Sequence, residues 1–243
     1  RNVDNEQAKD CYLLFAIRNF QQAHRACIAA ARDGDAKAQH HMASMARTSG
    51  EFDAAFHWAS QSARQGHAPG QLLLAGLYRS GEGTEVNESE AVDLLRAAAD
   101  QGMAEARYQV GMAYLQGQGV TRDAAQAASY LETAAEQNHV KAQLALADLH
   151  RSQRPDDPRA REWLRRAASQ NSPEAQYALG VSYSEGSAGA VDHLEAYVWL
   201  SRAVLNGYER ARSYLEQVAP QLTPEQLEVA QRRVQSSLAG RRS

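Results

Sequence analysis

One repeat runs along almost the whole chain, and it limits the possible folds more than any other feature of the sequence. A residue pair, Ala-Gln in half of its copies, recurs at steps of 32, 36, 36, 33 and 36 residues. A large side chain and a Gly or Asn recur in the same register. A period of this length is the signature of stacked two-helix units. The pairs are Ala38-Gln39, Gly70-Gln71, Ala106-Arg107, Ala142-Gln143, Ala175-Gln176 and Ala211-Arg212; the large side chains are Trp58, Leu94, Tyr130, Trp163 and Trp199; the third set is Gly34, Gly66, Gly102, Asn138, Asn171 and Gly207.

Each repeat predicts two helices joined by a turn. Ala106 and Val110 fall on one helical face, and Gly117 and Gly119 then interrupt that helix. A second helix is expected to begin near Asp123, because Asp caps helix N-termini well. Alanine is abundant while Val, Ile and Thr are scarce, a balance that favours helices over strands. The sequence therefore predicts an all-α protein.

We expect six helical hairpins that stack into a right-handed α-solenoid with a C-terminal cap. After the last hairpin, Thr223 can cap a helix that begins at Pro224, and Gln226 completes a capping box. A solenoid must cover its exposed end, so this helix and the one before it are the predicted cap, and the final Ala-Gly-Arg-Arg-Ser should fray. The expected hairpins lie near residues 6–37, 38–69, 70–105, 106–141, 142–174 and 175–210, which form the repeat domain 1–210, and the capping helices and tail occupy 211–243.

Two of the repeats resemble a known family in detail. The segment ARYQVGMAYLQGQGV followed by AASYLETAAEQNH, and AQYALGVSYSEGSAG followed by AYVWLSRAVLNGY, are similar to Sel1-like repeats. These are relatives of tetratricopeptide repeats with a Gly-rich turn between the helices. The resemblance covers about residues 6–210, but repeats 1, 2 and 5 lack the GxG element of the turn. In repeat 5, Pro155 and Pro158 are expected to stop one helix and start the next.

The resemblance implies a non-catalytic scaffold or adaptor that binds another protein, or an extended peptide, on a concave surface lined by the first helix of each hairpin. In bacteria, many such proteins work outside the cytoplasm, and some are candidates for immunity proteins that block a secreted toxin, such as a type VI secretion effector. A solvated helix face remains the alternative for each candidate contact residue. The candidates are His41, Arg47, Arg79, Gln109, Met112, Gln116, Asp148, Arg151 and Ser152.

Charge and hydropathy argue against other partners. The 26 Lys and Arg residues are balanced by 29 Asp and Glu, so no strong field attracts nucleic acid or anionic lipid. The mean hydropathy is −0.57, and no apolar run approaches the ~18 residues of a membrane span. We expect a monomer, and we expect any signal sequence to be absent from this sequence, which begins at Arg1.

Catalytic and metal-binding patterns are missing from the sequence. It has no GxSxG, HExxH or phosphate-loop motif, and its eight histidines are scattered over different repeats. We therefore predict no catalytic residue, no metal site and no cofactor, with an enzyme or metal protein as the competing class. The aromatic side chains that follow the repeat are expected to pack in the core: Trp58, Trp163, Trp199, Tyr78, Tyr114 and Tyr183.

The two cysteines lie in the first hairpin. Cys11 and Cys27 are nearly equidistant from the turn at Asn19, and equidistant positions face each other in an antiparallel hairpin. We predict a disulfide between them, the alternative being two buried free thiols. Because cytosolic proteins seldom keep such bonds, the prediction also favours a bacterial periplasm or the extracellular side.

Overall fold

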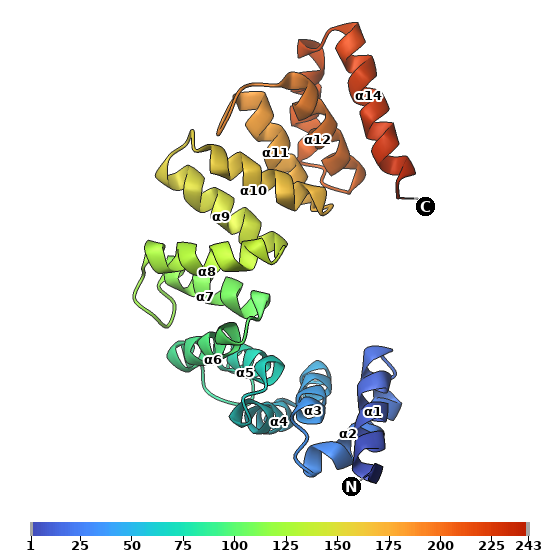
Figure 1. Ribbon diagram of the computed structural model, residues 1–243, viewed down its shortest axis with the longest axis vertical. Coiled ribbons are helices and arrows are strands. Elements are labelled where there is room, and N and C mark those ends of the chain that lie inside the picture. Colours follow the sequence, from blue (N-terminus) through green and yellow to red (C-terminus); the bar gives the residue numbers. More distant parts are fainter. Residues whose placement is uncertain (1, 242–243) are drawn as a thin grey trace. The chain divides into compact units, whose positions relative to one another are not determined.

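The computed structural model describes residues 2–241, and all of the regular structure within that range is helical (Figure 1). Consecutive helices pair into antiparallel hairpins, which confirms the predicted all-α repeat fold. The six hairpins are α1 (Asn2–Ala16) with α2 (Phe20–Arg32), α3 (Ala36–Thr48) with α4 (Phe52–Arg64), α5 (Ala68–Ser80) with α6 (Glu88–Asp100), α7 (Ala104–Gln116) with α8 (Ala124–Glu136), α9 (Val140–Gln153) with α10 (Pro158–Ser169), and α11 (Pro173–Glu185) with α12 (His193–Leu205).

Two further helices follow the hairpins. Helix α13 (Ala211–Val218) continues into a short 3-10 turn, η1 (Ala219–Gln221), and then comes α14 (Pro224–Ala239). The predicted capping box at Thr223 is present, and Val234 of α14 packs against Val198 of α12. The expected fraying of the last five residues is not seen at Arg241, whose guanidinium donates to the side-chain oxygens of Asn206 and Asn171 at 2.6 and 2.8 Å. The last two residues lie outside the described range.

The hairpins begin about two residues earlier than the sequence predicted. The first helices start at 36, 68, 104, 140 and 173, because Asp35, His139 and Ser172 cap three of them with side-chain hydrogen bonds. Helix α9 ends before Pro155 and α10 begins at Pro158, as predicted. Residues 1–130 and 131–243 form two compact units, called here the N-terminal and C-terminal halves, and the division falls inside α8.

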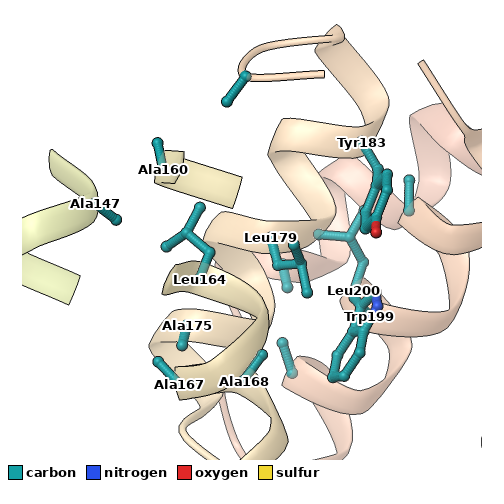
Figure 2. Close-up of a cluster of buried hydrophobic side chains, with 14 of the residues drawn as sticks. Ala147, Ala160, Leu164, Ala167, Ala168, Ala175, Leu179, Tyr183, Trp199 and Leu200 are labelled. Carbon is teal, nitrogen blue, oxygen red and sulfur yellow. The ribbon is translucent and has the colours of Figure 1, made fainter. Parts of the chain in front are cut away.

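Alanine and leucine fill the core of each half. In the N-terminal half, Leu77, Leu95 and Val110 are fully buried among alanines of α4–α7. In the C-terminal half, Leu164, Leu179 and Leu200 gather between α10, α11 and α12 (Figure 2). The small alanines let the helix backbones approach closely, while each fully buried leucine stabilises the fold by about 1.5–3 kcal/mol.

The expectation that the repeated aromatic residues are core residues is correct for only some of them. Trp199 and Tyr183 are buried, with exposed fractions of 9% and 7%. Trp58 and Trp163 are half-buried, as are Tyr78 and Tyr114. These four rings pack against the core clusters from their edge.

The glutamine of the repeated pair forms a hydrogen-bond relay between hairpins. Gln39 Nε2 donates to the carbonyl of Ala31 at the end of the previous hairpin (3.1 Å), and Gln39 Oε1 accepts from Gln65 at the end of its own hairpin (2.8 Å). Such a glutamine thus donates a hydrogen bond to the previous hairpin. It also accepts one from the residue that follows the second helix of its own hairpin. The same bonds recur in part or in full at Gln71 with Gln101, Gln143 with Ala135 and Gln170, and Gln176 with Ala168 and Asn206.

The Gly-rich loops of hairpins 3 and 4 lie against the preceding hairpin. At Gly83, a Cβ atom would stand 2.3 Å from the carbonyl oxygen of Phe52, the first residue of α4. At Gly119, it would stand 2.3 Å from the carbonyl oxygen of Glu88, the first residue of α6. Each of these loops therefore covers the first turn of the previous hairpin's second helix, and only glycine permits that approach.

We predict that Gly83→Ala destabilises the N-terminal half by about 2–4 kcal/mol, because strain at positive φ adds to a backbone clash. Gly66→Ala is the matched control: Gly66 also has a positive φ, of 77°, but its Cβ would meet nothing within 4 Å. That variant should lose only the ~1–2 kcal/mol of backbone strain. Urea unfolding followed by circular dichroism measures both, and equal losses in the two variants would refute the contact.

Candidate interaction surface

His41 is the one predicted contact residue that the fold buries. Only 7% of it is exposed, and its ring stacks on Phe15 with centroids 3.8 Å apart. It therefore forms part of the packing between α1 and α3. This burial has a simple cause: Phe15 of α1 covers a helix position that the sequence pattern places on the open face.

Arg47 and Arg79 are engaged with the following hairpin. Arg47 donates through Nε and Nη2 to both carboxylate oxygens of Glu82, at 3.2 and 3.0 Å. Arg79 donates to Gln109 Oε1 at 3.1 Å and lies 3.6 Å from Glu88. The ion pair with Arg47 lowers the pKa of Glu82. An arginine at the same repeat position thus links two successive hairpins at Arg47 and again at Arg79. This shared structural role explains why arginine recurs at that position.

The remaining candidates are more open. Gln116, Asp148, Arg151 and Ser152 are exposed, while Gln109 and Met112 are half-buried. Asp148 and Arg151 form an ion pair of 2.9 Å within one turn of α9, a contact that contributes little in solvent. Binding of a partner by these residues stays a prediction.

The sequence reasoning missed two positions that recur in the hairpins from α3 onward. They are the fifth residue of each first helix and the residue that follows the recurring Gly or Asn. Their side chains differ from hairpin to hairpin, and all of them are half-buried. We call them the N-terminal stripe, which consists of Asp35, His40, His67, Leu72, Met103 and Tyr108, and the C-terminal stripe, which consists of His139, Leu144, Ser172, Tyr177 and Tyr208.

Tyrosines dominate the C-terminal stripe. The rings of Tyr177 and Tyr208 lie 5.0 Å apart, and Tyr214 of α13 meets Tyr177 edge-on at 5.8 Å. The Tyr214 hydroxyl donates to Glu185 Oε1 at 2.9 Å, which raises the pKa of that hydroxyl. The recurring spacing of these positions was available in the sequence, but their side chains vary, so no repeated residue type marked them.

Histidines take the same two positions in the N-terminal half. The His40 ring lies 5.8 Å from His67 and 5.3 Å from the buried His41. Burial, followed by the neighbouring positive charges, lowers the pKa of His40 and of His41 to about 4. Burial also lowers the pKa of His67. The cluster is therefore neutral at neutral pH.

We predict that acid loosens this cluster. Because the folded-state pKa lies below the ordinary value of 6.5, its contribution to stability is complete above pH 6.5 and is lost as the pH falls toward 4. At pH 4.5, the protection of α3 against hydrogen exchange, corrected for intrinsic rates, should have dropped by about 2–3 kcal/mol. The control is His40→Gln/His41→Gln, in which this pH dependence should flatten; an unchanged slope would contradict the assignment.

A disulfide joins α1 to α2. Cys11 and Cys27 are bonded, with Cα atoms 4.6 Å apart, and neither cysteine is exposed. The bond packs beside Ala23 and Met42 in the core of the first hairpins. The predicted pairing is thus present in the structure.

We predict that reduction loosens the first hairpin before the rest. Closing a loop of this length stabilises by about 3 kcal/mol in the chain-entropy model, and the bond joins only α1 to α2. Hydrogen exchange with and without reductant should show lost protection in α1 and α2 and none lost in α11 and α12. A uniform loss over all helices would contradict a local role. Cys11→Ser/Cys27→Ser should reproduce the effect without reductant.

Residues 2–241 contain no group of three His, Cys, Asp or Glu side chains arranged to hold a metal ion. Over the same range, no helix combines the length and the apolar character that crossing a membrane requires.

A sequence model of the Sel1 repeat matches residues 36–67, 68–103, 104–139, 140–172 and 173–208. The chain belongs to the Sel1 repeat family. The five matched repeats correspond to the hairpins from α3–α4 to α11–α12. The first hairpin of this Sel1 repeat protein precedes the matched residues and has the same two-helix form. Proteins of the Sel1 family are generally protein-interaction scaffolds.

Solved structures share the Sel1 fold with this chain. The protective antigen c5321 of uropathogenic Escherichia coli superposes with a TM-score of 0.83 at 24% identity, over 96% of this chain and 54% of that one. A Sel1 repeat protein from Oxalobacter formigenes superposes at 0.78 and 23% identity, over 94% and 96%. An uncharacterized protein of Neisseria meningitidis is 35% identical over 95 residues, 38% of this chain. This Sel1 repeat protein spans only 20% of that relative's length.

Proposed function

We propose that this protein is a non-catalytic scaffold that binds another protein on the C-terminal stripe, with the tyrosines Tyr177 and Tyr208 and the neighbouring Tyr214 as the main anchor. The packed tyrosine cluster is the observation that carries the proposal. Tyrosine is enriched at the centres of protein interfaces, because its ring supplies apolar area and its hydroxyl supplies a hydrogen bond at low entropic cost.

The surroundings of the cluster suit a protein ligand. Leu144 and Val181 add half-buried apolar surface in the same half, while Glu174 and Arg210 are exposed nearby along the chain. An apolar centre with a charged rim is the common composition of an interface. The exposed candidates Asp148, Arg151 and Ser152 lie on α9 and are proposed as rim contacts.

Affinity capture from envelope extracts tests the proposal. The double variant Tyr177→Ser/Tyr214→Ser should retain at least tenfold less of the partner than the natural sequence does, as measured by quantitative mass spectrometry. The matched control is Tyr197→Ser, because Tyr197 is half-buried against α14 and away from the C-terminal stripe. Equal recovery of every captured protein by the natural sequence and the double variant would refute the proposed surface.

We also propose that the protein works in an oxidising compartment, the bacterial periplasm or the extracellular side. The disulfide of the first hairpin supports this, since such bonds are rare in the cytosol. Alkylation of the protein taken directly from its cells, followed by mass spectrometry, tests the compartment. Two alkylated thiols would overturn it. Identification of the captured partner as a secreted toxin would select the immunity alternative.

A further inference from the structure

A cavity of about 510 Å³ opens between the first two hairpins. Its volume lies within the range typical of ligand sites. It belongs entirely to the N-terminal half, and Phe20 at its mouth is 44% exposed. Its apolar walls are Phe15, Phe20, Ile28, Met42, Met45 and Trp58.

A missing loop explains the cavity. In hairpins 3 and 4, loops of seven residues (81–87 and 117–123) cover the first turn of the preceding second helix, through Gly83 and Gly119. Hairpin 2 has only three residues, 49–51, between its helices. Its turn is too short to cover the first turn of α2 in the same way.

The residues of α2 that no loop covers are equivalent to the residues of α4 that Gly83 contacts. Gly83 contacts Phe52 and Phe56, the first and fifth residues of α4. The equivalent residues of α2 are Phe20 and His24, and both line the cavity. Polypeptide of this chain therefore occupies, in the next two hairpins, the place that is open here.

Charges mark the two ends of the cavity. Phe20, His24, Ile28 and Arg32 follow one another at steps of four along α2, so the cavity extends about 18 Å along that helix. Arg32 lies at the C-terminal end of α2 and forms no ion pair with the described residues. Glu51, at the N-terminal end of α4, also lines the cavity and caps no backbone N–H.

We propose that this cavity binds an extended segment of the partner protein, five to six residues long by the ~3.3 Å rise of an extended chain. The segment carries large apolar side chains at its centre, a carboxylate toward Arg32 and a basic residue toward Glu51. The proposal rests on the scaffold function above and adds a second, separate contact to it. A peptide is the favoured occupant because a loop of polypeptide fills the equivalent place in hairpins 3 and 4.

A loop graft and a random peptide library test the proposal. Replacing residues 49–51 by the sequence of residues 81–87 fills the cavity with the chain's own loop. Selection of phage-displayed twelve-residue peptides on the natural protein should enrich sequences with an apolar centre and an acidic residue. These peptides should bind the graft at least tenfold more weakly.

Charge variants keep the test decisive should the graft fail to fold. Arg32→Glu should weaken the selected peptides at least tenfold and favour peptides whose acidic residue is replaced by lysine. Arg25→Glu is the matched control, an exposed arginine of α2 outside the cavity, and it should leave binding unchanged. The proposal is overturned if no peptide is enriched, or if the peptides bind Arg32→Glu as well as the natural protein.

The fluorescent anion 1-anilinonaphthalene-8-sulfonate separates a peptide site from a small-molecule site. Binding of this probe that the graft abolishes, without any enriched peptide, would assign the cavity to a small amphiphile and reject the peptide. The variant Tyr177→Ser/Tyr214→Ser should leave peptide binding unchanged, because both residues lie in the C-terminal half. If this variant loses the partner while no peptide is enriched on the natural protein, the scaffold function is upheld and only the cavity proposal is refuted.

Discussion

Replacing Arg161 by alanine should destabilise the C-terminal half by about 3–5 kcal/mol, as expected when buried polar groups lose a charged partner. The residue is 8% exposed. Its guanidinium donates to the carbonyls of Ser182, Ser187 and Ala190 at 2.8, 3.1 and 2.9 Å, and to the Ser182 hydroxyl at 3.0 Å. In the alanine variant, the Ser182 carbonyl and hydroxyl would stay buried without this donor, and the more open carbonyls of Ser187 and Ala190 would lose it as well.

The loop that precedes α12 depends on this arginine. A Cβ at Gly189 would stand 2.4 Å from the Arg161 guanidinium, and the Tyr183 ring lies 4.3 Å from it on another side. In hairpins 3 and 4, a glycine of the loop meets backbone of the previous hairpin, whereas here the loop meets a side chain. Arg161 therefore organises the loop from 187 to 190.

Chemical denaturation followed by tryptophan fluorescence measures the effect, since Trp163 and Trp199 both lie in the C-terminal half. Arg161→Lys keeps the charge but not the fork of donors, so it should lose an intermediate amount. Arg212→Ala is the control: its ion pair with Glu209 is exposed, and exposed pairs contribute at most about 1 kcal/mol. A loss below about 1 kcal/mol for Arg161→Ala would show that water replaces the guanidinium.

Trp199→Ala should also lose about 3–5 kcal/mol, the usual cost of removing a large buried aromatic side chain. The indole packs beside Leu200 and Leu179 in the core of the C-terminal half (Figure 2). Its N–H donates to Glu195 at 3.2 Å, and Arg202 lies over the ring at 4.4 Å. The half-buried Trp163 is the matched comparison, and its replacement should cost clearly less.

Partner capture distinguishes packing from binding at Trp199. The fraction of Trp199→Ala that remains folded should still retain the partner, because the side chain is in the core. A loss of stability below about 1 kcal/mol, together with lost capture, would instead make Trp199 a contact residue.

The repeat pattern predicted the fold well because packing repeats with it. Helix starts at Pro158 and Pro224 and the cap at Thr223 follow from local chemistry, which a sequence displays directly. The pairing of Cys11 with Cys27 follows from the symmetry of a hairpin about its turn. None of these predictions required knowledge of contacts between distant parts of the chain.

The functions of individual polar residues were harder to predict, because their partners lie in other hairpins. Arg47 was predicted to meet a partner protein, yet Glu82 of the next loop engages it. His41 was placed on an open face, yet Phe15 covers it. The structural role of Arg161 was not predicted, because most of its acceptors are backbone carbonyls. Every residue has such a carbonyl, so the sequence does not mark which ones accept a hydrogen bond. The tyrosine cluster was missed because the side chains at its positions vary from repeat to repeat.

The glutamine relay has a consequence for how the length of such a chain can change. Hairpins 2, 3, 5 and 6 have a Gln at the fourth position of the first helix and a Gln or Asn after the second helix. In each of them, the second residue donates a hydrogen bond to the first. Duplicating or deleting one whole hairpin between two such neighbours recreates the same bonds at the new junction. An insertion or deletion of only part of a repeat between a glutamine and its carbonyl separates the two groups and leaves both without their partner. Growth and shortening by complete hairpins is therefore the route that these side chains permit.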